Sequence, residues 1–117
     1  MRLNEVKFDA SPPIDAYGPG TFRIEGALWE GPLILSDAGP QAWAGWSDLA
    51  PLIALSERTD VVFLGMGAEI APLDRSVRTS LEEAGLAFET MGTGPACRTY
   101  NVMLSEGRRI AAALIPA

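Results

Sequence analysis

The 117-residue sequence contains no histidine, one cysteine and one lysine, and these shortages exclude several classes of site. Without histidine, Ser-His-Asp and Cys-His catalysis and His-ligated zinc or iron all lose their central residue. The single cysteine, Cys97, can form neither an intrachain disulfide nor a zinc site built from several thiolates. We therefore expect neither a metal nor a cofactor, and any catalysis would rest on carboxylates, tyrosines, arginines, Cys97 or Lys7.

Long apolar runs and an excess of positive charge are also missing. The longest strongly apolar stretch, Ile110–Ile115, is far too short to cross a membrane. Residues 1–6 have neither the apolar core of a signal peptide nor the composition of a transit peptide. Nine basic against fifteen acidic residues give a net charge of −6, which disfavours nucleic acid and anionic membranes as partners. We expect a cytoplasmic protein that is not membrane-embedded and binds no nucleic acid.

The length and an apolar content of 48% are typical of a single globular domain. No repeat, linker or low-complexity segment interrupts the chain, so we predict one domain over residues 1–117. Residues 1–20 are rich in turn-forming Pro and Gly, and we expect them to be irregular.

The first half of the chain predicts an N-terminal β-hairpin. Residues 21–25 alternate between polar and apolar, and Leu33–Ser36 is mostly apolar, so each predicts a strand. We expect the two strands to pair antiparallel, with a long loop between them. Residues 37–47 predict a loop, under which Trp43 and Trp46 pack as a satellite cluster.

Strands and helices alternate in the second half. Residues 60–64 are apolar after the first, which is typical of a strand buried on both faces. A helix is predicted to begin at Pro72, because apolar residues then recur every three or four positions up to the capping Gly85. A strand, a helix opened by Pro95 and a last strand are predicted over residues 86–90, 95–107 and 109–115. This order predicts an α/β fold, with helices packed on a β-sheet.

One candidate binding segment is a glycine loop. Gly65, Met66 and Gly67 follow the buried strand, where open α/β sheets usually bind ligands. The loop is not a dinucleotide fingerprint, because Ile70 stands in place of the third glycine, and no Gly-Lys-Ser/Thr follows to make a P-loop. It is either a ligand-facing loop or a tight turn leaving the sheet.

The second candidate is the start of the helix opened by Pro95. Free backbone N–H groups and the positive end of the dipole make such a helix start attractive to anions. A polar stripe follows one helical face: Gly94, Arg98, Asn101 and Ser105. Thr93, Arg98 and Asn101 are our candidates to bind a small anion or a partner's carboxylate. The alternative is that Arg98 and Asn101 only hydrogen-bond neighbouring loops.

Catalytic residues are harder to find. Cys97 lies in the first turn of this helix, a position that lowers a thiol pKa. Because no histidine can act as its base, a small buried side chain is the better interpretation of Cys97. No spacing brings two carboxylates together as an acid–base pair. We predict no catalytic residue, and the sequence favours a protein that is not an enzyme without deciding the question.

Short segments along nearly the whole chain resemble one known family. They include Ile14-Asp15-Ala16-Tyr17-Gly18, Val62-Phe63-Leu64-Gly65, Arg98-Thr99-Tyr100-Asn101 and the closing Ala113-Leu114-Ile115-Pro116. The sequence resembles bacterial members of the domain-of-unknown-function family that includes mitochondrial complex I assembly factor 3 and the adipogenesis-associated Mth-domain proteins. The resemblance implies a three-layer α/β fold with a central mixed β-sheet and no established catalytic residue.

Two functions of different classes stay open. The resemblance implies a non-catalytic interaction or assembly factor, because the mitochondrial relative helps to assemble respiratory complex I. Bacterial members are often encoded near protein-translocation genes, so the implied protein partners are components of a respiratory complex or of a translocation system. The alternative is a small-anion or metabolite-binding protein or enzyme, with its pocket between the 65–67 loop and the start of the Pro95 helix. The sequence does not predict an oligomeric state.

Overall fold

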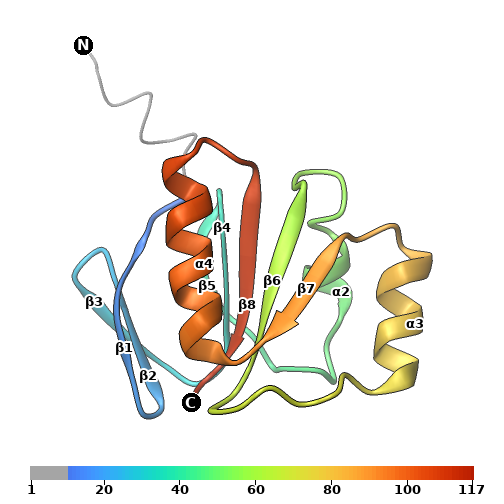
Figure 1. Ribbon diagram of the computed structural model, residues 1–117, viewed down its shortest axis with the longest axis horizontal. Coiled ribbons are helices and arrows are strands. Elements are labelled where there is room, and N and C mark those ends of the chain that lie inside the picture. Colours follow the sequence, from blue (N-terminus) through green and yellow to red (C-terminus); the bar gives the residue numbers. More distant parts are fainter. Residues whose placement is uncertain (1–10) are drawn as a thin grey trace.

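The computed structural model describes residues 11–117, which form two β-sheets and three α-helices (Figure 1). Expectations for residues 1–10 lie outside this part of the chain. The strands are β1 (Ile14–Gly18), β2 (Thr21–Ile24), β3 (Ala27–Glu30), β4 (Leu33–Ser36), β5 (Gly39–Ala42), β6 (Val61–Met66), β7 (Phe88–Met91) and β8 (Ile110–Ile115). The helices are α2 (Ala50–Ile53), α3 (Arg75–Glu83) and α4 (Thr93–Ser105).

The larger sheet has five strands in the order β5-β4-β8-β6-β7. β6 pairs parallel with β8 and β7, whereas β4 pairs antiparallel with β8 and β5, so the predicted mixed sheet is confirmed. β6 and β8 lie inside this sheet and are buried along most of their length, which is why their sequences do not alternate. Ala111, Ala112 and Ala113 of β8 are fully buried between close neighbours.

The smaller sheet is antiparallel, with strand order β1-β2-β3, so the predicted N-terminal β-hairpin is confirmed, although its strands differ from the expected ones. β2 pairs with β1 and β3, whereas β4 pairs within the larger sheet, so the expected pairing of β2 with β4 is wrong. The physical reason is a tight turn at Glu25 and Gly26, whose φ angles are 53° and 81°. The expectation that residues 1–20 are irregular is wrong for Ile14–Gly18, which form β1. β1 and β3 are short and largely exposed, so they lack the pattern of a buried strand.

The central sheet separates two apolar layers. On one face, α4 and the smaller sheet pack over side chains that include Phe63, Ala112 and Leu114. On the other face, α2 and α3 pack over side chains that include Val62 and Leu64. Figure 1 shows α4 crossing in front of the central sheet, with the smaller sheet beside it. This is the three-layer arrangement that the family resemblance implies.

The helix starts differ slightly from the expected positions. α3 begins later than Pro72, because the Asp74 carboxylate accepts the Ser76 N–H at 3.1 Å and caps the helix there. α4 begins at Thr93 rather than Pro95. Pro95 is tolerated inside the first turn, because N–H groups in that turn have no intrahelical acceptor.

The expectation that Trp43 and Trp46 form a separate satellite cluster is wrong. Trp43 is 5% exposed and belongs to the main apolar layer under α2 and α3. Its ring meets Trp46 edge-on, with ring centres 4.9 Å apart, and its Nε1–H donates to the Asp48 carbonyl at 2.8 Å. The expected loop over residues 37–47 also contains a strand, β5. This edge strand brings Trp43 over the sheet, so the tryptophan extends the core.

Candidate interaction site on helix α4

The start of α4 is bonded to the ends of β6 and β8. Thr93, the first residue of α4, is fully buried. Its Oγ1 accepts the Gly67 N–H at 2.8 Å and donates to the Ile115 carbonyl at 2.5 Å. Its own N–H donates to the Gly67 carbonyl at 2.8 Å. The polar groups of Thr93 are therefore used to join the helix to the sheet.

Glycine at position 65 permits this close approach. A Cβ on Gly65 would lie 2.9 Å from both Thr93 Oγ1 and Leu114 Cδ2, which is too close for any side chain. Gly67 follows with a φ of 107°, a conformation that glycine adopts readily. Met66 is half-buried and packs against the layer formed by α2 and α3. The structure thus brings Gly65, Met66, Gly67 and Thr93 together, with the contacts of a tight turn that leaves the sheet.

The middle of α4 holds the segment that leads into β1. The Asn101 Oδ1 accepts the Ile14 N–H at 2.9 Å, and the Asn101 Nδ2 donates to the Ile14 carbonyl at 2.9 Å. The Tyr100 hydroxyl, fully buried, donates to the Pro12 carbonyl at 2.7 Å. Nothing in the sequence indicates that Tyr100 bonds a residue so distant in the chain. Both side chains fix the path of β1 across the helix.

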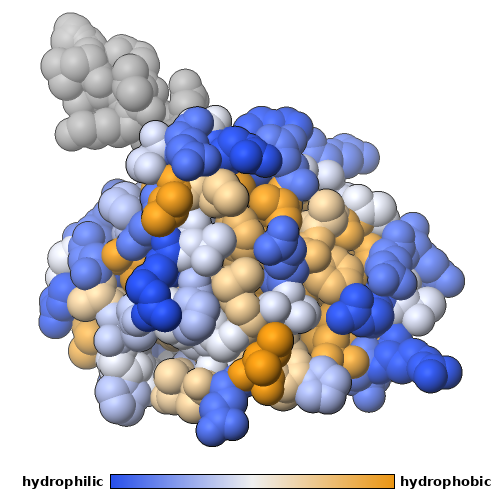
Figure 2. All heavy atoms as spheres, in the orientation of Figure 1, coloured by the Kyte–Doolittle hydropathy of each residue, from blue (hydrophilic) through white to orange (hydrophobic). Residues whose placement is uncertain are grey.

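Arg98 lies on the exposed side of α4, beside β1. Its Nη1 donates to the Tyr17 hydroxyl, and a Cβ on Gly94 would lie 3.1 Å from the same hydroxyl oxygen. Glycine at position 94 therefore leaves room for Tyr17 to reach the helix. Tyr17 is 39% exposed, and Val102, one helical turn beyond Arg98, is 56% exposed. We call Tyr17, Arg98 and Val102 the α4 face. Strongly hydrophobic and strongly hydrophilic side chains lie next to each other on this side of the molecule (Figure 2).

The predicted site residues form two separate groups. The 65–67 turn and Thr93 bond to each other at the C-terminal end of β6, whereas Arg98 and Asn101 bond to residues of β1. Two cavities in the described part of the chain are lined by other residues, one at the opposite end of β6 and one on the smaller sheet. Tyr17 was not among the predicted site residues. The only sequence signal for it is its place in the segment 14–18, which contributes to the family resemblance.

Reactive side chains in this region are shielded from solvent. Cys97 is 1% exposed, and burial raises the pKa of its thiol to about 12. Burial likewise raises the pKa of the Tyr100 hydroxyl, so both groups stay protonated at neutral pH. Within residues 11–117, His, Cys, Asp and Glu side chains do not gather in any group of three that could hold a metal ion. The exposed chemistry of the α4 face is a guanidinium, a phenol ring and an aliphatic side chain, a combination suited to binding.

Fold and site together define an α/β protein with a five-stranded mixed sheet, in which one helix ties that sheet to an N-terminal antiparallel sheet. The chain belongs to the family described as "Protein of unknown function (DUF498/DUF598)", which matches residues 14–115. This membership confirms the resemblance inferred from the sequence.

Named relatives span most of the chain. An uncharacterized protein of Rhodobacter capsulatus is 47% identical over 116 residues, which cover 99% of this chain and 94% of that protein. NADH dehydrogenase (ubiquinone) 1 alpha subcomplex assembly factor 3 of Danio rerio is 32% identical, over 99% of this chain and 71% of that protein. A crystal structure described as an outer membrane protein from Bartonella henselae superposes with a TM-score of 0.82. It is 34% identical and covers 93% of this chain and 98% of its own. In residues 11–117 of the present chain, every helix is too short or too polar to span a membrane.

Proposed function

We propose that this protein is a non-catalytic interaction or assembly factor, and that it contacts a protein partner through the α4 face. The relationship to assembly factor 3 over nearly the whole chain supports the class of function. The choice of this surface as the contact rests on a single observation, the pairing of the exposed Arg98 guanidinium with the partly exposed Tyr17 hydroxyl. Two other polar side chains of the same helical motif, Tyr100 and Asn101, are occupied by backbone groups of the chain.

The α4 face has the chemistry of a binding hot spot. Arginine and tyrosine are among the residues that most often dominate interface energies. A guanidinium carries five N–H donors, so Arg98 keeps donors for a partner's carboxylate or carbonyl while it holds Tyr17. Val102 adds an exposed aliphatic surface one turn further along the helix. Asn101 and Tyr100 act as positioning residues, because they fix β1 and hence the location of Tyr17.

The partner that we propose is a component of a respiratory complex. Support comes from the name of the Danio rerio relative, an assembly factor of the NADH dehydrogenase 1 alpha subcomplex. A component of a protein-translocation system is the other partner that the family resemblance implies. The cytoplasmic location expected from the N-terminal sequence stays a prediction, and the Bartonella henselae relative is described as an outer membrane protein.

A pull-down of the tagged full chain from its own organism tests the proposal. We expect wild-type protein to recover respiratory-complex components, and Arg98→Ala or Val102→Asp to reduce that recovery by about tenfold or more. Arg75→Ala, which removes the same charge from the exposed surface of α3, should leave recovery unchanged. Equal recovery by Arg98→Ala and wild type, with both proteins folded by circular dichroism, would refute the α4 face as the contact.

The alternative function, a small-anion site between the 65–67 loop and the start of α4, stays a prediction. Two of the groups that would face such an anion, the Thr93 N–H and hydroxyl, already bond within the chain. Saturable binding of inorganic phosphate that shifts the amide resonances of Gly67 and Thr93 would favour this alternative.

A further inference from the structure

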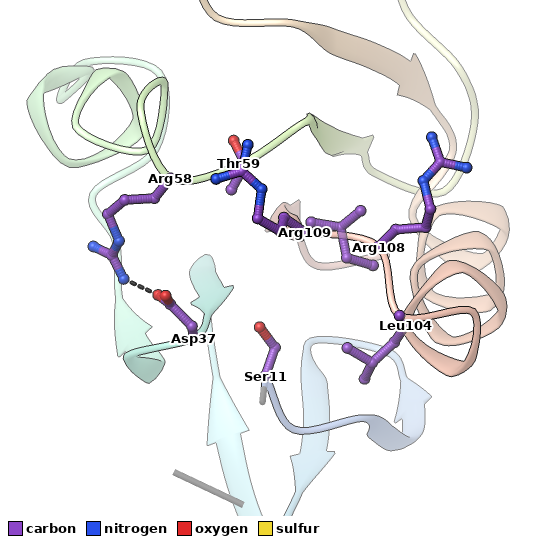
Figure 3. Close-up of a pocket in the computed structure, with 9 residues that line it drawn as sticks. Ser11, Asp37, Arg58, Thr59, Leu104, Arg108 and Arg109 are labelled. Atoms are coloured by element: carbon purple, nitrogen blue, oxygen red, sulfur yellow. Dashed lines mark ion pairs between the residues drawn. The ribbon is translucent and has the colours of Figure 1, made fainter. Parts of the chain in front are cut away.

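A second surface feature lies at the opposite end of the central sheet from the 65–67 turn. There a cavity of about 280 Å³ opens where the chain enters β6 and β8 and leaves α4. Four segments distant in sequence line it (Figure 3). The lining residues are Ser11, Asp37, Arg58, Thr59, Leu104, Gly107, Arg108, Arg109 and Ile110.

Positive charge is concentrated at this cavity. The chain has nine basic residues and a net charge of −6, yet Arg58, Arg108 and Arg109 all line this one cavity. Asp37 is the only acidic residue among the lining side chains. Three guanidinium groups stand against two carboxylates, those of Asp37 and of Asp60, the ion-pair partner of Arg109, and the remaining positive charge attracts oxyanions.

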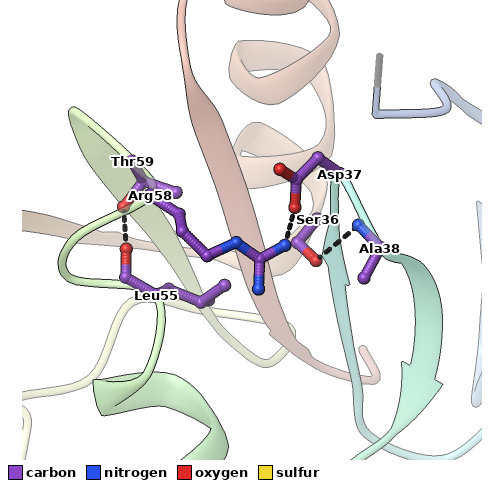
Figure 4. Close-up of polar contacts among 6 residues, drawn as sticks. All are labelled: Ser36, Asp37, Ala38, Leu55, Arg58 and Thr59. Carbon is purple, nitrogen blue, oxygen red and sulfur yellow. Dashed lines mark hydrogen bonds and ion pairs between the residues drawn. The ribbon is translucent and has the colours of Figure 1, made fainter. Parts of the chain in front are cut away.

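The arginine at one rim is held by an internal carboxylate. Arg58 Nη2 forms an ion pair with Asp37 Oδ1, and the two side chains are 45% and 46% exposed (Figure 4). The backbone on both sides of this pair is fixed, because Ser36 Oγ accepts the Ala38 N–H at 3.2 Å. On the other side, the Thr59 hydroxyl donates to the Leu55 carbonyl at 2.8 Å. The pair therefore joins two anchored turns across the cavity.

The remaining arginines keep donors available. Arg109 Nη2 donates to Asp60 Oδ1 at 2.9 Å, which uses only part of its guanidinium fork. Among residues 11–117, Arg108 has no carboxylate within ion-pair distance, and its guanidinium points away from the cavity centre (Figure 3). Ser11 is only 9% exposed, and its hydroxyl points into the space between Asp37 and Leu104.

We propose that this cavity binds a small oxyanion, a phosphate or carboxylate group, between Arg58 and Arg109, and that Asp37 competes with the ligand for Arg58. Guanidinium groups bind both kinds of oxyanion through paired N–H donors. The cavity lies near the lower limit of small-molecule sites, about 300 Å³, so the ligand is small. This site is separate from the α4 face and does not depend on the function proposed for that face.

The test is an NMR titration of the full chain at constant ionic strength, with inorganic phosphate in one series and succinate in another. We expect saturable shifts of the Thr59, Arg109 and Ile110 amide resonances. Arg58→Ala should weaken binding several-fold. Asp37→Asn should tighten it several-fold, because it releases the Arg58 guanidinium. Arg75→Ala is the matched control, since it removes one positive charge from α3 and should leave the dissociation constant unchanged.

Two results would overturn the proposed oxyanion site itself. One is the absence of saturable shifts with either ion in the folded wild-type protein. The other is equal weakening by Arg75→Ala and Arg58→Ala, which would assign the effect to the overall charge. Tighter binding of phosphate or of succinate identifies which oxyanion the cavity takes. An Asp37→Asn variant that is folded but binds no tighter would disprove the competition between the ligand and Asp37.

Discussion

The side-chain amide of Asn101 binds both backbone groups of Ile14, accepting its N–H and donating to its carbonyl, each at 2.9 Å. An amide that pairs with one residue in this way replaces a neighbouring strand, because it satisfies a donor and an acceptor together. The contact ties α4 to the first residue of β1 and so joins the smaller sheet to the rest of the protein. It also determines where Tyr17 lies on the α4 face.

Replacing Asn101 by alanine should destabilise the protein by about 1–3 kcal/mol, because two partly buried backbone groups lose their partner. Urea unfolding followed by circular dichroism measures this loss. Ser105→Ala is the control on the same helix, because the Ser105 hydroxyl is exposed and donates only within α4. A loss for Asn101→Ala as small as that of the control would contradict the anchoring role.

Thr93 should tolerate serine better than valine. Thr93→Val keeps the shape of the side chain but removes the hydrogen bonds to the Gly67 N–H and the Ile115 carbonyl. We expect a loss of about 1–3 kcal/mol for valine and a smaller loss for serine, which retains the hydroxyl. Thermal unfolding of the two variants provides the comparison. Equal stability of the two variants would show that the hydroxyl contributes no more than the buried methyl group that serine lacks.

Alanine at position 65 should be strongly destabilising. Its Cβ would lie 2.9 Å from Thr93 Oγ1 and 3.1 Å from Thr93 Cα, so the start of α4 would have to move away from β6. We expect a loss of about 1–3 kcal/mol in urea unfolding. Gly18→Ala is the matched control, because a Cβ there would meet only Thr21 Oγ1, at an ordinary 3.7 Å. If both variants unfold at the same urea concentration, steric crowding does not explain why position 65 is glycine.

The thiol of Cys97 should be unreactive in the folded protein. Burial raises its pKa to about 12, so almost no thiolate is present at a pH of about 8, and reagents cannot reach the sulfur. Ellman's reagent should therefore label Cys97 slowly in buffer and completely in urea. The chain has one cysteine, so the signal is unambiguous. Fast labelling of the native protein would reveal an opening of α4 that this structure does not contain.

The pair of Asp60 and Arg109 should make stability depend on pH in the acid range. The hydrogen bond from Arg109 lowers the pKa of Asp60 below its ordinary value of 3.8. The unfolded chain therefore takes up the proton first, and the stabilisation is present above about pH 4 and lost as the pH falls through the folded pKa.

Asp60→Asn provides the measurement. The difference in melting temperature between wild type and Asp60→Asn should shrink between about pH 6 and about pH 2. A difference that stays constant over this range would mean that the pair does not contribute through its charge.

Features encoded by local periodicity were predictable. The apolar run that forms β6 and the stripe of apolar residues on α3 each report burial within a few neighbouring residues. The candidate residues on α4 were found because helical spacing places Arg98 and Asn101 on one face. Strands β1 and β3 could not be found in this way, because short, exposed strands carry no apolar pattern. The pairing of β2 depends on a two-residue turn, and the sequence pattern did not distinguish that turn from a longer loop.

By itself, the sequence determined the α/β class, the buried strands and the absence of histidine-based chemistry and of an intrachain disulfide, because these follow from composition and short-range pattern. The tertiary structure alone decided which strands pair, which groups Arg98 and Asn101 bond, and that three arginines line one cavity. The physical reason is distance along the chain: Asn101 and Ile14 are 87 positions apart, and their hydrogen bonds form only when the packed core brings both segments together.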